Sequence, residues 1–65
     1  MRLTVNGEPQ EVRASTLEAL LAELDYEGSW LATARNGELV HAEDRGTCLL
    51  TEGDRIEILS PMQGG

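Results

Sequence analysis

The residues with the clearest chemical meaning are Gly64 and Gly65, at the end of the sequence. Glycine has no Cβ, so two in succession form a slim backbone that rotates freely and can enter a channel too narrow for side chains. The terminal carboxylate is an anion at neutral pH because such groups titrate near about pH 3.5. An anionic carboxylate resists nucleophiles until it is converted to a mixed anhydride. We therefore interpret Gly64-Gly65 as a reactive terminus, the alternative being a tail of glycines without function.

No other group of residues predicts catalysis by the chain itself. The single cysteine, Cys48, excludes an internal disulfide and, with His41 the only histidine, leaves too few ligands for a structural zinc site. Cys48 is interpreted as a small buried hydrophobe, and His41 as a solvated loop residue. The acidic pair Glu43-Asp44 lacks the further oxygen ligands that a metal site needs. We expect no bound metal and no catalytic residue.

Composition and charge narrow the class of partner. The chain has 65 residues and a net charge of −7, from twelve acidic residues against five basic ones. Such a surface repels nucleic acid and is more compatible with a basic protein partner, the alternative, preferred for most of the acidic residues, being that they simply keep the chain in solution. No leader or apolar run of bilayer length is present in the sequence, which predicts a cytoplasmic protein without membrane contact. The absence of lysine disfavours a tag that builds polymers on itself.

The first half of the sequence predicts a hairpin followed by a helix. Leu3 and Val5 alternate with polar residues, Asn6-Gly7 is a strong hairpin-turn signal, and a second strand should run through Val12 and Ala14. A helix should follow, with a capping box formed by Ser15 and Glu18, and should end near residues 25–26. One face of this helix is apolar and is assigned to the core. The residues of that face are Leu17, Leu20, Leu21 and Leu24.

The second half predicts a further strand pair and a final strand. Residues 30–35 are interpreted as a strand, Asn36-Gly37 as a tight turn and residues 39–40 as the start of the return strand. Residues 41–46 read as an irregular polar segment, residues 49–50 as a possible short strand, and residues 52–54 as a turn. Ile56 and Ile58 then alternate with polar residues in a strand that ends at Ser60-Pro61.

This order of elements predicts an α+β fold, with a mixed sheet covered on one face by one main helix. It is the pattern of a ubiquitin-like β-grasp, with residues 1–60 as the domain and residues 61–65 as a flexible C-terminal tail. The fold resemblance implies that the last strand lies centrally, beside the first.

The chain resembles the ThiS family, the sulfur carriers of thiamine biosynthesis, over its whole length. The similar features in the body of the chain are Asn6-Gly7, the leucine helix and residues 34–37. The most specific features are residues 53–58, Gly-Asp-Arg-Ile-Glu-Ile, and the tail that follows Ser60. His41 departs from the family pattern, which has proline there in many members. The tail residues are Pro61, Met62, Gln63, Gly64 and Gly65.

The resemblance implies a protein co-substrate and not an enzyme. An E1-like adenylating enzyme would use ATP and Mg²⁺ to adenylate the carboxylate of Gly65, and a persulfide derived from a cysteine desulfurase would then supply sulfur. The product would be a C-terminal thiocarboxylate that thiazole synthase consumes in forming the thiazole ring. Residues 61–64 would be gripped by these partners, and no cofactor would be bound by the chain itself.

A docking surface is expected on the face of the sheet away from the helix. Trp30, Leu50 and Leu59 are apolar residues that exceed what so small a core can hide, and exposed apolar patches often mark binding sites. The acidic residues Glu52, Asp54 and Glu57 would then meet basic residues of the partner. The alternative is that all three apolar residues belong to the core.

Other functions remain open from the sequence. The small subunit of molybdopterin synthase shares the fold and the Gly-Gly end, although it is usually longer, and thiocarboxylate carriers of other pathways exist. A ubiquitin-like protein modifier would instead join Gly65 to a lysine of a target. A plain interaction domain would make no use of Gly65.

Overall fold

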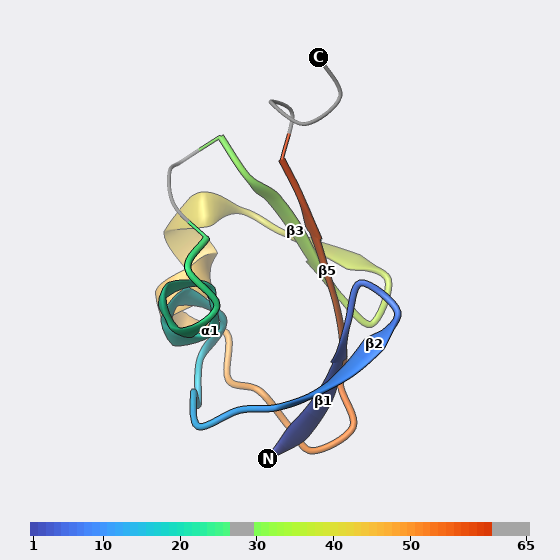
Figure 1. The fold of residues 1–65 in the computed structure, drawn as a ribbon. Coiled ribbons are helices and arrows are strands. Elements are labelled where there is room, and N and C mark those ends of the chain that lie inside the picture. The colour runs from blue at the N-terminus through green and yellow to red at the C-terminus, as the bar shows by residue number, and fades with distance from the viewer. Residues whose placement is uncertain (27–29, 61–65) are drawn as a thin grey trace.

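The computed structural model describes residues 1–26 and 30–60 (Figure 1). The tail and its assignment to residues 61–65 lie outside this range. Within it, five strands, one α-helix and one 3₁₀ helix follow one another along the chain. In order they are β1 (Arg2–Val5), β2 (Glu8–Glu11), α1 (Leu17–Glu23), β3 (Ala32–Arg35), β4 (Glu38–Val40), the 3₁₀ helix η1 (Ala42–Thr47) and β5 (Arg55–Leu59).

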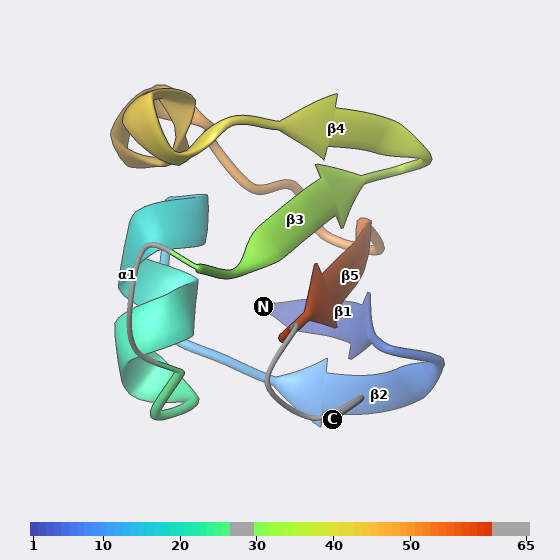
Figure 2. The same cartoon turned by 90° about the horizontal axis from the view of Figure 1, so that it is seen from above.

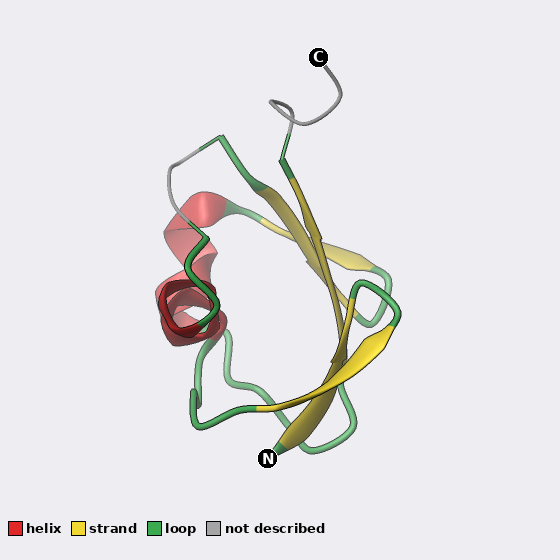
Figure 3. Ribbon diagram, in the orientation of Figure 1, coloured by secondary structure: helices red, strands yellow, loops and turns green. Residues whose placement is uncertain are grey.

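The five strands form one mixed sheet in the order β2-β1-β5-β3-β4. The last strand lies in the centre, beside β1, as the fold resemblance implied (Figure 2); it is parallel to β1 and antiparallel to β3. Both helices lie on the same side of the sheet, and its other face is left uncovered by them (Figure 3). The α+β, β-grasp arrangement is therefore confirmed.

Both Asn-Gly dipeptides form the predicted tight turns. Asn6 and Gly7 have φ values of 51° and 83°, and Asn36 and Gly37 have φ values of 52° and 86°. Positive φ at both central residues is the requirement of a type I′ turn, whose twist matches that of the paired strands. The strand β2 is shorter than expected, since Val12 and Ala14 are buried beyond its end.

The helix begins one residue later than its predicted cap. Thr16, not Ser15, is the N-cap, and its hydroxyl accepts a hydrogen bond from the Ala19 N–H at 3.2 Å. The third helical position is therefore Ala19, so the predicted capping box with Glu18 is wrong. The helix also ends slightly early, at Glu23. Asp25 then takes φ 64°, and the N–H groups of residues 25 and 26 bond back to the last turn, a Schellman closure.

The predicted leucine face of α1 does enter the core. Leu17 and Leu20 are completely buried, Leu21 is nearly so, and Leu24 packs at the margin. Each large side chain removed from water here contributes about 1.5–3 kcal/mol to folding, which makes this face the main link between helix and sheet. The other core residues are Leu3, Val5, Val12, Ala14, Leu31, Leu50, Ile56 and Ile58.

The segment predicted to be irregular, residues 41–46, is instead largely the 3₁₀ helix η1. Its Arg45 is buried, and its guanidinium donates hydrogen bonds to the Leu31 carbonyl and, from Nε at 3.2 Å, to the Thr33 hydroxyl. These bonds fasten η1 to β3. The expected short strand at residues 49–50 is reduced to a single bridge between Thr16 and Leu49. Within the described residues, no helix is long and apolar enough to span a membrane.

Candidate functional site

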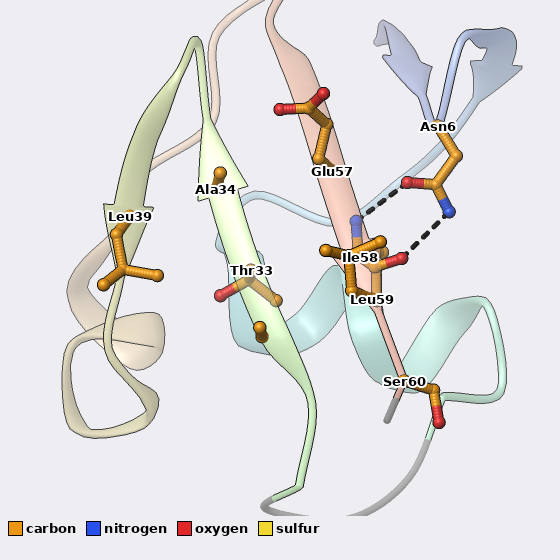
Figure 4. Close-up of a pocket in the computed structure, with 9 residues that line it drawn as sticks. Asn6, Thr33, Ala34, Leu39, Glu57, Ile58, Leu59 and Ser60 are labelled. Carbon is orange, nitrogen blue, oxygen red and sulfur yellow. Dashed lines mark hydrogen bonds between the residues drawn. The ribbon is translucent and has the colours of Figure 1, made fainter. Parts of the chain in front are cut away.

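The uncovered face of the sheet carries a shallow groove at the end where β5 finishes (Figure 4). We call it the outer groove. Its floor is formed by β3 and β5, which pair Ala32 with Leu59 and Ala34 with Glu57. Most of its outward side chains are apolar, and the exposed carboxylate of Glu57 stands among them. The residues that line the groove are Asn6, Ala32, Thr33, Ala34, Leu39, Glu57, Ile58, Leu59 and Ser60.

Of the predicted docking residues, two are exposed and one is buried. Leu59 is 67% exposed in the outer groove, and Trp30 is 76% exposed just before β3. Trp30 stands in a turn outside β3 and is not among the residues that line the groove. Leu50 is only 7% exposed and belongs to the core, so its inclusion in a docking surface is wrong.

Sequence reasoning missed Leu39, which is 65% exposed and lines the same groove from β4. Its cross-strand partner is Ala34, whose small side chain leaves Leu39 standing above the sheet. The signal that could have found it is the alternation within β4, where Val40 turns toward the core and Leu39 must therefore turn outward.

The C-terminal end of β5 is held by the side chain of Asn6. Its Oδ1 accepts a hydrogen bond from the Ile58 N–H at 2.8 Å, and its Nδ2 donates to the Ile58 carbonyl at 3.2 Å (Figure 4). Asn6 had been noted in the sequence only for its turn. A turn dipeptide does not reveal which distant strand its side chain will meet.

The N-terminal end of β5 is held by a buried carboxylate. Asp54 accepts hydrogen bonds from Arg35 Nε at 2.8 Å, Asn36 Nδ2 at 3.0 Å and the Thr51 N–H at 2.8 Å. Burial by itself raises the pKa of Asp54, but the bonds from Arg35, Asn36 and Thr51 together outweigh burial and hold the pKa below its ordinary value. The hydrogen bond to Asp54 in turn raises the pKa of Arg35.

This cluster corrects one expectation about charge. Asp54 was expected to face a basic partner, but it is buried and its charge is used within the domain. Glu52 is exposed, yet its Oε1 accepts a hydrogen bond from the Arg2 N–H at 3.1 Å. Of the three acidic residues, only Glu57 lies in the outer groove.

Several other candidates can be placed. Cys48 is half-buried and packs against the core, while His41 is exposed at the start of η1. Among residues 1–26 and 30–60, no three His, Cys, Asp or Glu side chains are gathered in a way that could hold a metal ion. The predicted site of modification, Gly65, and the predicted grip residues Pro61, Met62, Gln63 and Gly64 lie outside the described range.

Comparison with known proteins identifies the family of the chain. The family model described as "ThiS family" matches residues 3–65, a range that includes the Gly64-Gly65 pair. A sulfur carrier protein ThiS from Thermus thermophilus is 33% identical over 61 residues, which cover 94% of this chain and 95% of that protein.

A thiazole synthase from Paramagnetospirillum magneticum is 38% identical over 66 residues, which cover all of this chain. The chain spans only 20% of the length of that protein. The similarity is therefore confined to one part of it.

The fold is likewise shared with a solved structure. The crystal structure of the thiamine biosynthesis protein ThiS from Geobacter metallireducens superposes with a TM-score of 0.84 and 32% sequence identity, and the match covers 100% of both chains.

Proposed function

Because the chain belongs to the ThiS family, we propose that it carries sulfur for thiamine biosynthesis as a thiocarboxylate on Gly65. The observation that carries this proposal is the family match, which runs through the whole domain and includes Gly64-Gly65. The similarity to a named sulfur carrier over 95% of that protein supports the same role. In this role the chain is a substrate of its partners and not a catalyst.

The loading step follows from the chemistry of a carboxylate. An oxygen of the Gly65 carboxylate attacks the α-phosphorus of ATP in the site of an E1-like enzyme, with Mg²⁺ bound to the phosphates, and pyrophosphate leaves. The resulting acyl-adenylate has a carbonyl carbon that a nucleophile can attack. Two glycines allow the partner to close around this carbon and to exclude the water that would hydrolyse it.

Sulfur then replaces the adenylate. The terminal sulfur of a persulfide, formed through a cysteine desulfurase, attacks the carbonyl carbon and AMP leaves. A thiol reduces the resulting acyl disulfide, and the carbon retains one sulfur as a thiocarboxylate. This sulfur is a soft nucleophile, suited to the formation of a thiazole ring. The similarity of the whole chain to part of a thiazole synthase supports thiazole synthase as the acceptor.

The outer groove is the surface proposed for docking. Leu39 and Leu59 are largely exposed there, and a partner that covers them removes apolar area from water. Glu57 lines the same groove, across Ala34 from Leu39, and offers one charge to a lysine or arginine of the partner. Residues 61–65 continue from Ser60, which also lines this groove, so docking brings Gly65 within reach of the same partner.

The test is the intact mass of the chain purified from cells grown without thiamine, before and after alkylation of thiols. The proposal predicts a fraction with one oxygen replaced by sulfur and with the alkyl group on Gly65. A Cys48→Ala variant is the matched control, since it removes the other thiol while changing only a side chain at the margin of the core. A carboxylate that stays unmodified with the adenylating enzyme, ATP and a persulfide donor all supplied would contradict the proposal.

A further inference from the structure

The strand β5 extends beyond the end of its parallel neighbour β1. The strand β1 ends at Val5, which is in register with Ile56, and the chain turns away at Asn6 with φ 51°. The last backbone bond of this ladder joins the Asn6 N–H to the Ile56 carbonyl at 2.9 Å. Beyond that bond, the backbone of β1 is no longer available to β5, although β5 continues to Leu59.

The side chain of Asn6 takes the place of the missing strand. One primary amide has an acceptor and a donor side by side, and here both bond to Ile58, at 2.8 Å and 3.2 Å (Figure 4). The N–H and C=O of one strand residue point to the same side, so these two groups of Ile58 face Asn6 and not β3. The Asn6 amide therefore pairs with Ile58 as a further residue of β1 would.

The contact between Asn6 and Ile58 lies beside the proposed docking surface. Ile58 lies two residues before Ser60, and Asn6, Ile58 and Ser60 all line the outer groove. The Asn6 Nδ2 is also 3.4 Å from the Tyr26 hydroxyl, in the segment that follows α1. The amide thus joins the first turn of the chain to the end of the strand from which residues 61–65 continue.

We propose that Asn6 is a positioning residue for sulfur loading, which holds the end of β5 fixed relative to the docking surface. This inference depends on the proposed function, in which Gly65 must reach the site of an adenylating enzyme. Five extended residues reach at most about 17 Å. If the end of β5 separates from the sheet, docking of the domain no longer fixes the position at which residues 61–65 begin. A small misplacement of a reacting group can lower the reaction rate by a large factor.

The test compares Asn6→Gly with Asn36→Gly. Both residues have positive φ, which glycine accepts, so each change removes an amide and leaves the turn intact. Asn36 bonds to the opposite end of β5, through its Oδ1 to the Arg55 N–H at 2.8 Å, and does not line the outer groove. It is therefore the matched control for loss of stability.

Adenylation, the first step of loading, is measured as ATP–pyrophosphate exchange with the adenylating enzyme of the same organism. The measurement is made at a temperature at which both variants are folded. For Asn6→Gly we expect kcat to fall about tenfold while KM stays within about twofold, because Leu39 and Leu59, the apolar residues of the docking groove, are unchanged while the end of β5 is no longer aligned. For Asn36→Gly both constants should stay within about twofold of the original chain. Hydrogen exchange at the Ile58 amide should accelerate in Asn6→Gly alone.

The inference is overturned if the two variants load equally well, or if the loss in Asn6→Gly is entirely in KM. If Asn6→Gly does not fold, Asn6→Asp takes its place, because a carboxylate still accepts from the Ile58 N–H but repels the Ile58 carbonyl. Asn6→Asp should then show the same loss of kcat, and normal kcat would again overturn the inference. Failure of the original chain to support any exchange would instead contradict the proposed function itself.

Discussion

The two Asn-Gly turns have the same sequence and nearly the same backbone, but they support opposite ends of β5 in different ways. At one end, the side chain of Asn6 bonds to the backbone of Ile58 and, at 3.4 Å, to the Tyr26 hydroxyl. At the other end, Asn36 bonds to the Arg55 N–H and also to the buried carboxylate of Asp54. The dipeptide specifies the turn in both cases. The hydrogen-bond partners of the asparagine side chain depend on which part of β5 the turn contacts.

The two ends of β5 should therefore contribute to different properties, one to the stability of the fold and the other to sulfur loading. The N-terminal end of β5 is organised around a charge that has three hydrogen-bond donors, and such a charge cannot be removed without leaving those donors unpaired. The C-terminal end is held by a neutral amide beside an exposed groove. Changes at the first end should therefore affect folding, and changes at or beyond the second end should affect sulfur loading.

The largest effect is expected from Gly65→Ala, beyond the C-terminal end of β5. The added Cβ would obstruct a channel that admits only backbone, so sulfur loading should be abolished. The midpoint of thermal unfolding should not change. Intact mass after incubation with the adenylating enzyme, ATP and a persulfide donor measures loading. Normal loading of this variant, or of a chain lacking Gly65, would contradict the role given to the terminal glycine.

The next effect is expected at the N-terminal end, from Asp54→Ala. The change removes a buried acceptor of three hydrogen bonds and should lower the free energy of unfolding by about 2–3 kcal/mol. Urea unfolding at pH 7 measures this loss. Loading of the folded variant should be unchanged, and a loss of loading without a loss of stability would break the distinction between the two ends.

A smaller effect is expected from Leu59→Asp in the outer groove. Placing a charge where the partner covers an apolar side chain should raise KM for adenylation about tenfold, the equivalent of roughly 1.4 kcal/mol. Leu49→Asp is the matched control, because Leu49 is equally exposed, at 68%, but does not line the groove. Equal KM values for the two variants would remove the groove from the docking surface.

The smallest effect is the response of Asp54 to acid. Its pKa is lower in the folded chain than the ordinary value of 3.8. The stability that it contributes is therefore complete above about pH 4 and is lost as the pH falls through the lower, folded value. The difference in unfolding free energy between the original chain and Asp54→Asn should accordingly shrink below pH 4. A difference that stays constant down to the lowest pH at which both chains fold would exclude this linkage.

The elements specified by local sequence were predictable. Each Asn-Gly turn, the leucine face of α1 and the alternation around Ile56 and Ile58 depend on residues close together in the chain. The errors of detail were also local, as in the choice between Ser15 and Thr16 for the helix cap. Neighbouring hydroxyl residues offer the same chemistry, and only the path of the backbone decides between them.

The residues that connect distant segments could not be predicted. Arg45 lies in a polar run that is typical of a solvated loop, but the Leu31 carbonyl and the Thr33 hydroxyl provide a buried position for it. Asp54 was taken for a surface charge because its partner Arg35 is distant in sequence. Leu50 was assigned to the surface because a count of apolar residues does not reveal how many of them the core accepts.

The central place of β5 also has a consequence for folding kinetics. The hairpins β1–β2 and β3–β4 are joined in the sheet only through β5, which pairs Thr4 with Arg55 across most of the chain. Until β5 is inserted, each hairpin has an unpaired edge and little of the core is closed. A contact between such distant residues is slow to form. We therefore expect folding to be a single cooperative event, limited by the arrival of the last strand.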